Sequence, residues 1–181
     1  MNLSVREIQE QDIPLLVAYW TTAEPDFLKG MGVDLAKMPS ADDFTAMLMN
    51  QLNTAIELKR SFCMIWELDG KPVGHSNTNP TTFGEEATMH LHIWKPQHRA
   101  AGMGLAFVKL TVPEFFEKLR LKTLFCEPYA LNPAPNRTLE KAGFEFVKEY
   151  TTTPGSLNFE QPVKRWQMTY ERLKSLKIYD R

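Results

Sequence analysis

Two glycines placed two residues apart, Gly102 and Gly104, constrain the fold of this chain more than any other feature. They follow an alternating run at 87–94 that predicts a strand, and they precede a run at 105–119 with helical spacing of apolar residues. A strand–loop–helix junction points backbone N–H groups outward at the positive end of a helix dipole, where a pyrophosphate can bind. Glycine has no Cβ and therefore lets a phosphate approach the backbone closely. The alternative is an ordinary loop that contains glycine.

The spacing of apolar residues elsewhere predicts a fold that mixes strands and helices. Alternation predicts strands at 3–8, 61–68, 71–79, 87–94, 123–127, 144–150 and 163–171. Helical spacing predicts helices that begin near residues 13, 41, 105 and 132. Residues 22–39 are expected to form a loop or a short irregular helix. This order predicts an α/β (α+β) fold, a mixed sheet flanked by helices, in a single domain over residues 1–181.

Short signals predict where some of these elements begin, turn or bend. Ser40, with an aspartate three residues later, approximates a capping box. Asp69-Gly70 is typical of a two-residue hairpin turn. Asp12 is expected to cap the first helix with its side chain. Pro113 is expected to kink or split the helix in which it lies.

Composition and charge argue against several functional classes. The net charge is −1, so bulk electrostatics do not recruit nucleic acid or an anionic membrane, and no basic–aromatic patch indicates a nucleic-acid-binding module. No apolar run approaches the ~20 residues of a membrane helix, and the N-terminus lacks a signal-peptide pattern. Cys63 and Cys126 lie in apolar runs and are expected to be buried free thiols, which indicates a reducing, cytoplasmic location.

Two motifs resemble those of a known protein family. Arg99-x-x-Gly102-x-Gly104 resembles the Q/R-x-x-G-x-G/A signature of the GNAT acyltransferases. Segments 127–132 and 139–144 resemble the family region in which an asparagine after a strand precedes a short helix ending in lysine, a small residue, glycine and phenylalanine. Both motifs stand at the family's spacing. The chain is therefore identified as a member of the GNAT family, similar to its RimJ/RimL-type and siderophore- and aminoglycoside-acetyltransferase-type subgroups.

The resemblance implies a fold and a co-substrate. The GNAT fold has a mixed, mostly antiparallel central sheet of about seven strands flanked by helices. Its parallel neighbours, here 87–94 and 123–127, splay apart, and acetyl-CoA lies in the resulting V with its pyrophosphate on residues 99–104. The cofactor-binding residues implied in this way are Ile93, Trp94, Arg99, Ala100, Ala101, Gly102, Met103, Gly104, Asn132 and Asn136. Asn132 also fits the N-cap of the following helix, and the two roles are compatible.

Four residues near the splayed strands are candidates for proton transfer. His90 and His92 lie on one face of their strand, and histidine titrates near neutral pH, which suits a general base. Siderophore-type members resemble this chain in having a histidine on this strand, although they have an aspartate where Tyr129 stands. RimI-type members use a glutamate that aligns with Glu127. Their tyrosine acid aligns with Leu139, so Tyr129 is a candidate substitute for it.

The same side chains also have ordinary structural interpretations. Each histidine could be a hydrogen-bonded sheet residue, and Glu127 could be a strand-end carboxylate bonded to a loop. His90 and His92 could also be two metal ligands, with His75 or Glu127 nearby. No third ligand is evident in the sequence, and no metal is expected.

The activity implied by the resemblance is acetyl transfer from acetyl-CoA to a primary amine, by direct attack in a ternary complex. The expected acceptor is a small-molecule amine or a protein N-terminus, with neither nucleic acid nor membrane as a partner. Since no covalent enzyme intermediate is needed, the two cysteines are not expected to act as nucleophiles. The alternative function is a non-catalytic acyl-CoA-binding or sensing domain that keeps the same cleft.

Overall fold

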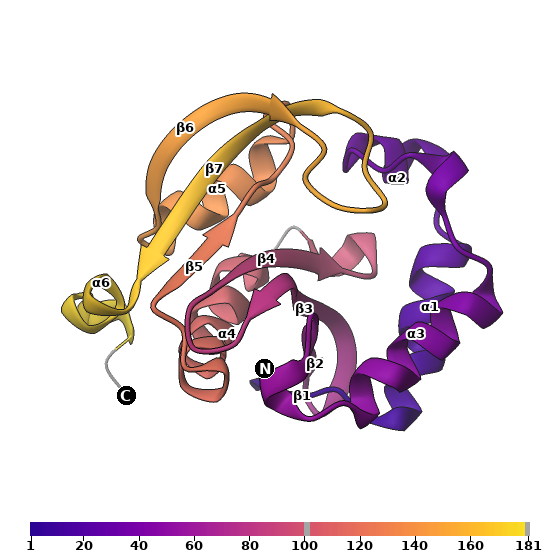
Figure 1. The fold of residues 1–181 in the computed structure, drawn as a ribbon, viewed down its shortest axis with the longest axis horizontal. Coiled ribbons are helices and arrows are strands. Elements are labelled where there is room, and N and C mark those ends of the chain that lie inside the picture. The colour runs from indigo at the N-terminus through magenta and orange to yellow at the C-terminus, as the bar shows by residue number, and fades with distance from the viewer. Residues whose placement is uncertain (100–101, 180–181) are drawn as a thin grey trace.

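A computed structural model describes residues 1–99 and 102–179, so the predicted cofactor residues Ala100 and Ala101 lie outside the described residues. The strands are β1 (Leu3–Glu7), β2 (Phe62–Leu68), β3 (Lys71–Thr82), β4 (Glu86–Ile93), β5 (Thr123–Cys126), β6 (Glu145–Thr152) and β7 (Gln161–Thr169). They form one sheet in the order β1-β2-β3-β4-β5-β7-β6 (Figure 1). β4 and β5 are parallel and the other neighbours are antiparallel. The predicted mixed, mostly antiparallel sheet is confirmed.

Helices cover both faces of this sheet. They are α1 (Ile13–Thr21), α2 (Pro25–Gly30), α3 (Ala41–Asn53), α4 (Met103–Leu119), α5 (Pro133–Lys141) and α6 (Tyr170–Ser175). Because side chains of a strand alternate between faces, Met64 and Trp66 of β2 join the core built on α4, whereas Cys63 and Ile65 pack against Leu16 of α1. Within the described ranges, no helix has both the length and the hydropathy needed to cross a bilayer.

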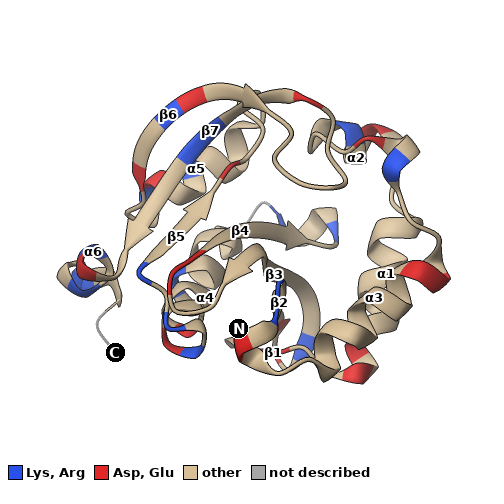
Figure 2. Cartoon of the chain, in the orientation of Figure 1, with Lys and Arg blue, Asp and Glu red and all other residues tan. Residues whose placement is uncertain are grey.

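The middle of the sheet is poor in charged residues. In β3 the only Lys, Arg, Asp or Glu is Lys71, and in β4 it is Glu86, and each stands at the first position of its strand. Figure 2 shows the charged residues mainly on the helices and on the outer strands. The central strands β3 and β4 therefore contribute almost only uncharged side chains to any cavity that opens onto them.

Two of the local signals are confirmed. The hydroxyl of Ser40 accepts a hydrogen bond from the amide of Asp43 at 3.1 Å, which caps α3. Asp69 and Gly70 both have positive φ, 50° and 75°, as a two-residue hairpin turn between β2 and β3 requires.

The capping prediction for Asp12 is wrong, and of the two outcomes expected at Pro113, a kink or a split, the split does not occur. Asp12 stands at the N-cap of α1 but makes no side-chain capping bond, because its carboxylate pairs with Arg6 at 2.6 Å. Pro113 does not split its helix, which runs unbroken through it. Phe107 and Phe115 of that helix are fully buried, and at about 1.5–3 kcal/mol for each buried apolar side chain the packing offsets the ~3 kcal/mol cost of an interior proline.

Two segments differ from the sequence prediction in their secondary structure. Residues 22–39 contain α2 and a short 3₁₀ helix, Leu35–Lys37, so they are more regular than expected. The last strand ends at Thr169 rather than residue 171, because the Thr169 hydroxyl accepts from the amide of Arg172 at 3.2 Å and starts α6. No acidic or amide residue stands three positions after Thr169, so no capping box marked this start in the sequence.

Candidate active site

β4 and the chain that follows β5 separate at the end of β5, where Tyr129 bridges to Val163 of β7 and not to β4. Their pairing runs from Glu86 opposite Thr123 to Met89 opposite Cys126, and β4 continues to Ile93 beyond the last pair. The predicted splay of the parallel neighbours is therefore confirmed.

The splay leaves backbone groups of β4 facing an open edge. The amide of Trp94 donates to the carbonyl of Val73 on β3 at 3.0 Å. Because successive residues of a strand direct their N–H and C=O groups to opposite sides, those of Leu91 and Ile93 point away from β3, toward the opened edge. A ligand in the V can therefore pair with the main chain of β4.

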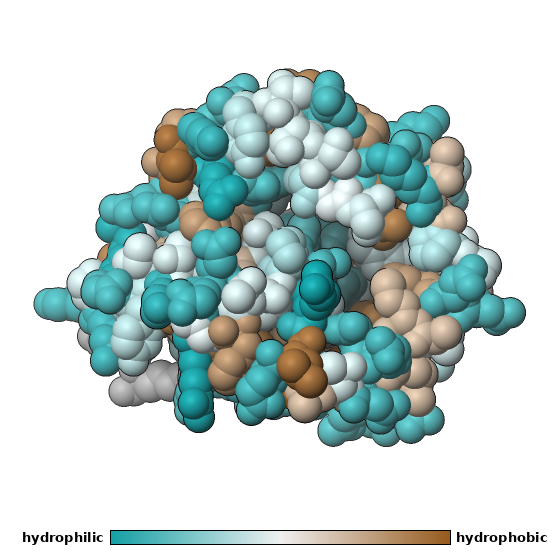
Figure 3. All heavy atoms as spheres, in the orientation of Figure 1, coloured by the Kyte–Doolittle hydropathy of each residue, from teal (hydrophilic) through white to brown (hydrophobic). Residues whose placement is uncertain are grey.

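Two cavities meet at the splay. One, of about 340 Å³, is lined by loop residues 154–158 and is called the loop cavity here. The other, of about 370 Å³, is lined by Gly102 and Gly104 and is called the glycine cavity. The residues that line both are Met31, Leu91, His92, Asn132 and Pro135. Figure 3 shows this face of the molecule hollowed between β4 and the loop that follows β6. A ligand in one cavity can therefore contact a ligand in the other.

The glycine cavity lies at the N-terminus of α4, where the first backbone N–H groups have no partner inside the helix. Gly102 is the N-cap and has φ 69°, in the left-handed region that favours glycine, and Gly104 lies in the first turn. Arg99 folds back onto the end of β4, with Nε donating to the Ile93 carbonyl at 3.0 Å and Nη2 to the Trp94 carbonyl at 3.1 Å. Arg99 therefore holds the glycine loop against the strand.

The glycine cavity is also positively charged. Arg137 and Lys141 of α5 line it together with Arg99, and no Asp or Glu is among its described lining residues. Arg137 and Lys141 were not among the predicted cofactor-binding residues, although their spacing of four residues puts both on one helix face. This cavity is suited to an anionic ligand.

Two residues predicted to bind the cofactor have side chains committed to the fold. Met103 is 4% exposed and belongs to the hydrophobic core. Asn136 donates from Nδ2 to the carbonyls of Tyr129 and Asn132 at 3.2 and 2.8 Å, and its Oδ1 accepts from Trp166 at 2.9 Å. The Asn136 side chain therefore supports the backbone beneath the cavity wall, because all of these bonds are to other parts of the protein.

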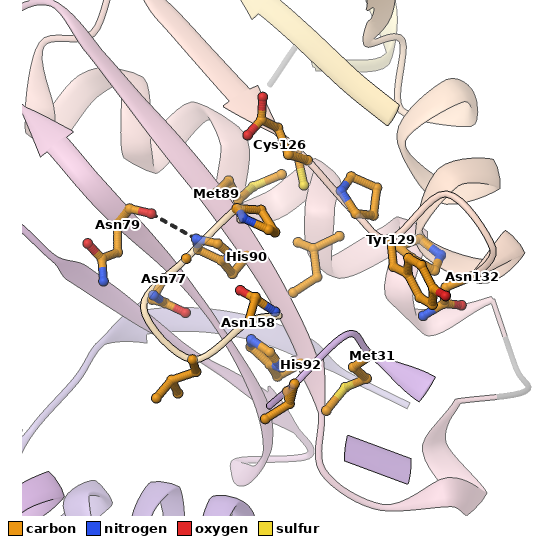
Figure 4. Close-up of a pocket in the computed structure, with 18 of the residues that line it drawn as sticks. Met31, Asn77, Asn79, Met89, His90, His92, Cys126, Tyr129, Asn132 and Asn158 are labelled. Carbon is orange, nitrogen blue, oxygen red and sulfur yellow. Dashed lines mark hydrogen bonds between the residues drawn. The ribbon is translucent and has the colours of Figure 1, made fainter. Parts of the chain in front are cut away.

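His90 projects from β4 into the loop cavity, beside Asn77 and Asn79 of β3 (Figure 4). Its Nε2 lies 2.8 Å from the Asn79 carbonyl, and a carbonyl only accepts, so Nε2 carries the proton. Burial lowers the pKa of His90, against the opposing effect of the Asn79 carbonyl. The ring is therefore neutral near pH 7, and Nδ1 is the nitrogen that can accept a proton.

His92 is part of the shared wall and belongs to an aromatic cluster that continues behind it. Its ring stacks on His75 at 4.6 Å, and its Nδ1 lies 3.3 Å from the Tyr19 hydroxyl. Trp94 Nε1 donates to Nδ1 of His75 at 2.8 Å, which requires a neutral His75. Burial is the main cause that lowers the pKa of His75 to about 3 and that of His92 well below its usual value. Both rings are therefore neutral near pH 7.

The histidines do not form a metal site with their neighbours. Across residues 1–99 and 102–179, no group of three or more His, Cys, Asp or Glu side chains is placed to hold a metal ion. His75 and His92 lie face to face, an arrangement in which ring nitrogens do not converge on one point.

Glu127, just after β5, lines the loop cavity but is already paired. Its Oε1 accepts from Nη1 of Arg165 at 2.7 Å and from the Tyr150 hydroxyl at 2.5 Å. The carboxylate is only 9% exposed, and the positive charge of Arg165 balances its own. Neither partner carried a local sequence signal, because both come from strands that reach Glu127 only through the fold.

Tyr129 is the last of the four predicted proton-transfer residues, and the two cysteines were predicted to be buried free thiols. Tyr129 lines the loop cavity and packs edge to face against Phe159 at 6.0 Å. All four predicted proton-transfer residues thus lie on one cavity. Cys63 and Cys126 are free and buried, and burial raises the pKa of both thiols, which disfavours a nucleophilic thiolate.

Comparison with known proteins assigns the chain to a family. The family model described as an acetyltransferase (GNAT) domain matches residues 2–145. The chain belongs to the GNAT acetyltransferase family. GNAT members use acetyl-CoA as their co-substrate. No curated protein sequence matches this one.

Solved GNAT structures share the fold of the chain. Aminoglycoside acetyltransferase AAC(6')-Ib in complex with coenzyme A has a TM-score of 0.74 and 16% identity, over 97% of this chain and 99% of that one. A spermidine N-acetyltransferase SpeG chimera from Vibrio cholerae and hSSAT has a TM-score of 0.77 and 13% identity, over 97% and 100%. The ribosomal protein α-N-acetyltransferase RimL in complex with coenzyme A has a TM-score of 0.75 and 11% identity, over 95% and 96%. At these identities the likeness shows the GNAT fold.

Proposed function

We propose that this GNAT protein, acting as one domain over residues 1–181, transfers the acetyl group of acetyl-CoA to a primary amine by direct attack in a ternary complex. The observation that carries the proposal is the wall shared by the two cavities at the splay of β4 and β5. Direct transfer needs both substrates bound at once with their reacting atoms in contact. Two adjacent cavities that share lining residues can hold both substrates in contact.

The glycine cavity is the proposed donor site. The N-terminus of α4 and the cations Arg137 and Lys141 suit the pyrophosphate and the other phosphate of CoA. The pantetheine would extend along the open backbone edge of Leu91 toward the loop cavity. Asn132 stands at the N-cap of α5 without a side-chain capping bond and lines both cavities, so its amide is available to the pantetheine.

The loop cavity is the proposed acceptor site, with His90 as the general base. The neutral amine attacks the thioester carbonyl carbon, a C–N bond forms, and the carbonyl oxygen becomes an oxyanion. The Leu91 N–H faces the open edge and is our candidate donor to that oxyanion. Nδ1 of His90 accepts the proton that the attacking nitrogen loses, directly or through water. The C–S bond then breaks, and Tyr129 is our candidate proton donor to the departing thiolate.

The other candidates have supporting roles in this proposal. His92 lines both cavities and is held by Tyr19 and His75, so we assign it to positioning the thioester rather than to taking the proton. Glu127 is the second candidate base, but it would have to act while bonded to Arg165 and Tyr150.

A thiol-release assay tests the proposal. Purified protein is incubated with acetyl-CoA and a panel of primary amines and N-terminal peptides, and free CoA and acetylated product are both measured. We expect amine-dependent thiol release with matching product. Binding of CoA without product from any amine would contradict the proposal and favour the acyl-CoA-sensing alternative.

A further inference from the structure

The loop cavity offers no uncompensated negative charge to a ligand. Glu127 is the only Asp or Glu among the described residues that line it, and its carboxylate is paired with Arg165 at 2.7 Å. His90 and His92, which also line this cavity, are neutral near pH 7, and burial raises the pKa of the Cys126 thiol, so that it is uncharged as well. A second ammonium on the acceptor would therefore be desolvated without a carboxylate to pair with it.

Side-chain amides are the most numerous kind of polar group that lines this cavity. Asn77, Asn79, Asn132, Asn158 and Gln161 contribute them. Gln161 is 1% exposed, its Nε2 donates to two backbone carbonyls, and its Oε1 has no hydrogen-bond partner among the described residues. Amides recognise hydroxyl and amide groups, which both donate and accept, without needing charge on the ligand.

The loop cavity is also roofed. Residues 153–160, between β6 and β7, cross to the segment after α2, as the ribbon shows (Figure 1). The Asp34 amide donates to the Leu157 carbonyl at 2.8 Å, and the Gly32 carbonyl accepts from Asn158 Nδ2 at 2.9 Å and from the Phe159 amide at 3.3 Å. Lys37 Nζ adds a bond to the Asn158 carbonyl at 2.7 Å. An extended peptide laid across the V would have to displace this connection.

From these features we infer that the acceptor is a small molecule with one primary amine and an otherwise uncharged body bearing hydroxyl or amide groups. Polyamines, aminoglycosides and folded proteins are then disfavoured acceptors. The inference rests on the proposed function, because it specifies the substrate class of the same acetyl transfer.

A matched pair of probes tests the charge requirement. 5-Aminopentan-1-ol and 1,5-diaminopentane have the same chain length and differ in whether the far end is a neutral hydroxyl or a second ammonium. We expect kcat/KM for acetylation of the amino alcohol to exceed that of the diamine by at least about tenfold. Spermidine, kanamycin and an octapeptide with a free N-terminus should be acetylated still more slowly.

Two variants test whether the missing negative charge causes this preference. Arg165→Gln removes the cation that compensates Glu127, and Asn77→Asp adds a carboxylate to the cavity wall. Either change should raise kcat/KM for the diamine relative to the amino alcohol by about three- to tenfold. Lys164→Gln is the matched control, because Lys164 is on the same strand but pairs with Glu149 and does not line the cavity. It should leave the ratio unchanged.

The outcomes separate the substrate class from the activity. Equal or faster acetylation of the diamine, kanamycin or the peptide by the wild-type protein would overturn the inference and leave the acetyltransferase activity standing. A ratio that neither variant moves, with both folded, would also overturn it. A protein that binds CoA and acetylates none of the probes would overturn the proposed function together with the inference.

Discussion

The glycine cavity and the loop cavity share a wall but are built in different ways. The glycine cavity is formed chiefly by one strand–loop–helix junction and one face of α5, and it carries the three cations Arg99, Arg137 and Lys141. The loop cavity draws its lining from β3, β4, the end of β5, Met31 and Val33, the loop 154–158 and the start of β7, and the charge of its one carboxylate is balanced by Arg165. One site thus comes from local structure and positive charge, and the other from long-range contacts and neutral polar groups.

This difference teaches where ligand specificity resides in the chain. The phosphates of a donor can be bound by backbone N–H groups and nearby cations, and a strand–loop–helix segment provides these N–H groups locally. In the proposed reaction, the acceptor would be selected by side chains that several distant segments bring together. A substitution in one cavity should therefore leave the affinity of the other cavity for its ligand largely unchanged. The following experiments test this independence.

The largest effect is expected from His90→Gln. Glutamine keeps an N–H that can donate to the Asn79 carbonyl, but it cannot take a proton from the amine. We expect kcat to fall by about 10²–10⁴-fold, the usual cost of losing a general base. The dissociation constant of CoA, measured by calorimetry, should not change, because His90 lines only the loop cavity.

His98→Gln is the control for this variant, since His98 lies in the short 3₁₀ helix Pro96–His98 after β4 and lines neither cavity. If His90→Gln turns over at the wild-type rate, His90 is not the general base, and Glu127 becomes the first candidate. A large loss of CoA affinity would contradict the separation of the two cavities.

The second-largest expected effect is on the free energy of unfolding at acid pH, and it arises at His75, behind the wall that the two cavities share. His75 has a folded-state pKa of about 3, below the unfolded value of about 6.5, so below pH 6.5 the unfolded chain binds the proton first. Stability is complete above pH 6.5 and is lost as pH falls toward 3, by about 1.4 kcal/mol per pH unit for this group. Between pH 6.5 and 5 His75 alone should lower the free energy of unfolding by about 2 kcal/mol.

Urea unfolding of the wild-type protein and His75→Gln at pH 7.5 and pH 5 measures this contribution. Glutamine can still accept the Trp94 N–H bond but does not titrate in this range. The variant should lose about 2 kcal/mol less than the wild type over that interval. Equal losses in both proteins would mean that His75 is not buried in its neutral form.

A smaller effect is expected from Gly104→Val at the donor site. A Cβ at Gly104 would meet only Ile93 Cδ1, at an ordinary 3.7 Å, so the fold should tolerate the side chain. It would project into the glycine cavity, where a pyrophosphate needs the backbone N–H groups. We expect CoA affinity to fall by at least about tenfold, or ~1.4 kcal/mol.

Gly30→Val is the matched control, because a Cβ there meets no atom within 4 Å and Gly30 lies in α2, outside both cavities. Thermal unfolding without ligand shows whether each variant is folded. A folded Gly104→Val protein that binds CoA as tightly as the wild type would remove the glycine cavity as the donor site.

The same contrast explains what the sequence could predict. The strands, most of the helices and the glycine junction follow from patterns within a few residues, such as the capping of α3 by Ser40 and the turn at Asp69-Gly70. The pairing of Glu127 with Arg165 joins residues 38 positions apart, and the roof joins Gly32 to Asn158. No local pattern encodes such contacts. The loop cavity therefore could not be predicted from the sequence alone.

The smallest effect should come from the cations of the donor site. Lys141→Gln removes one exposed positive charge that lines the glycine cavity. An exposed charge pair is worth about 0.2–1 kcal/mol, so CoA affinity should fall only about two- to fivefold. The loss should shrink as salt rises from 0.05 to 0.5 M, because screening weakens the interaction in the wild type. Lys174→Gln, on α6 and outside both cavities, is the control. A salt-independent loss larger than that of Gly104→Val would mean that side-chain charge, rather than the backbone of the glycine junction, holds the donor.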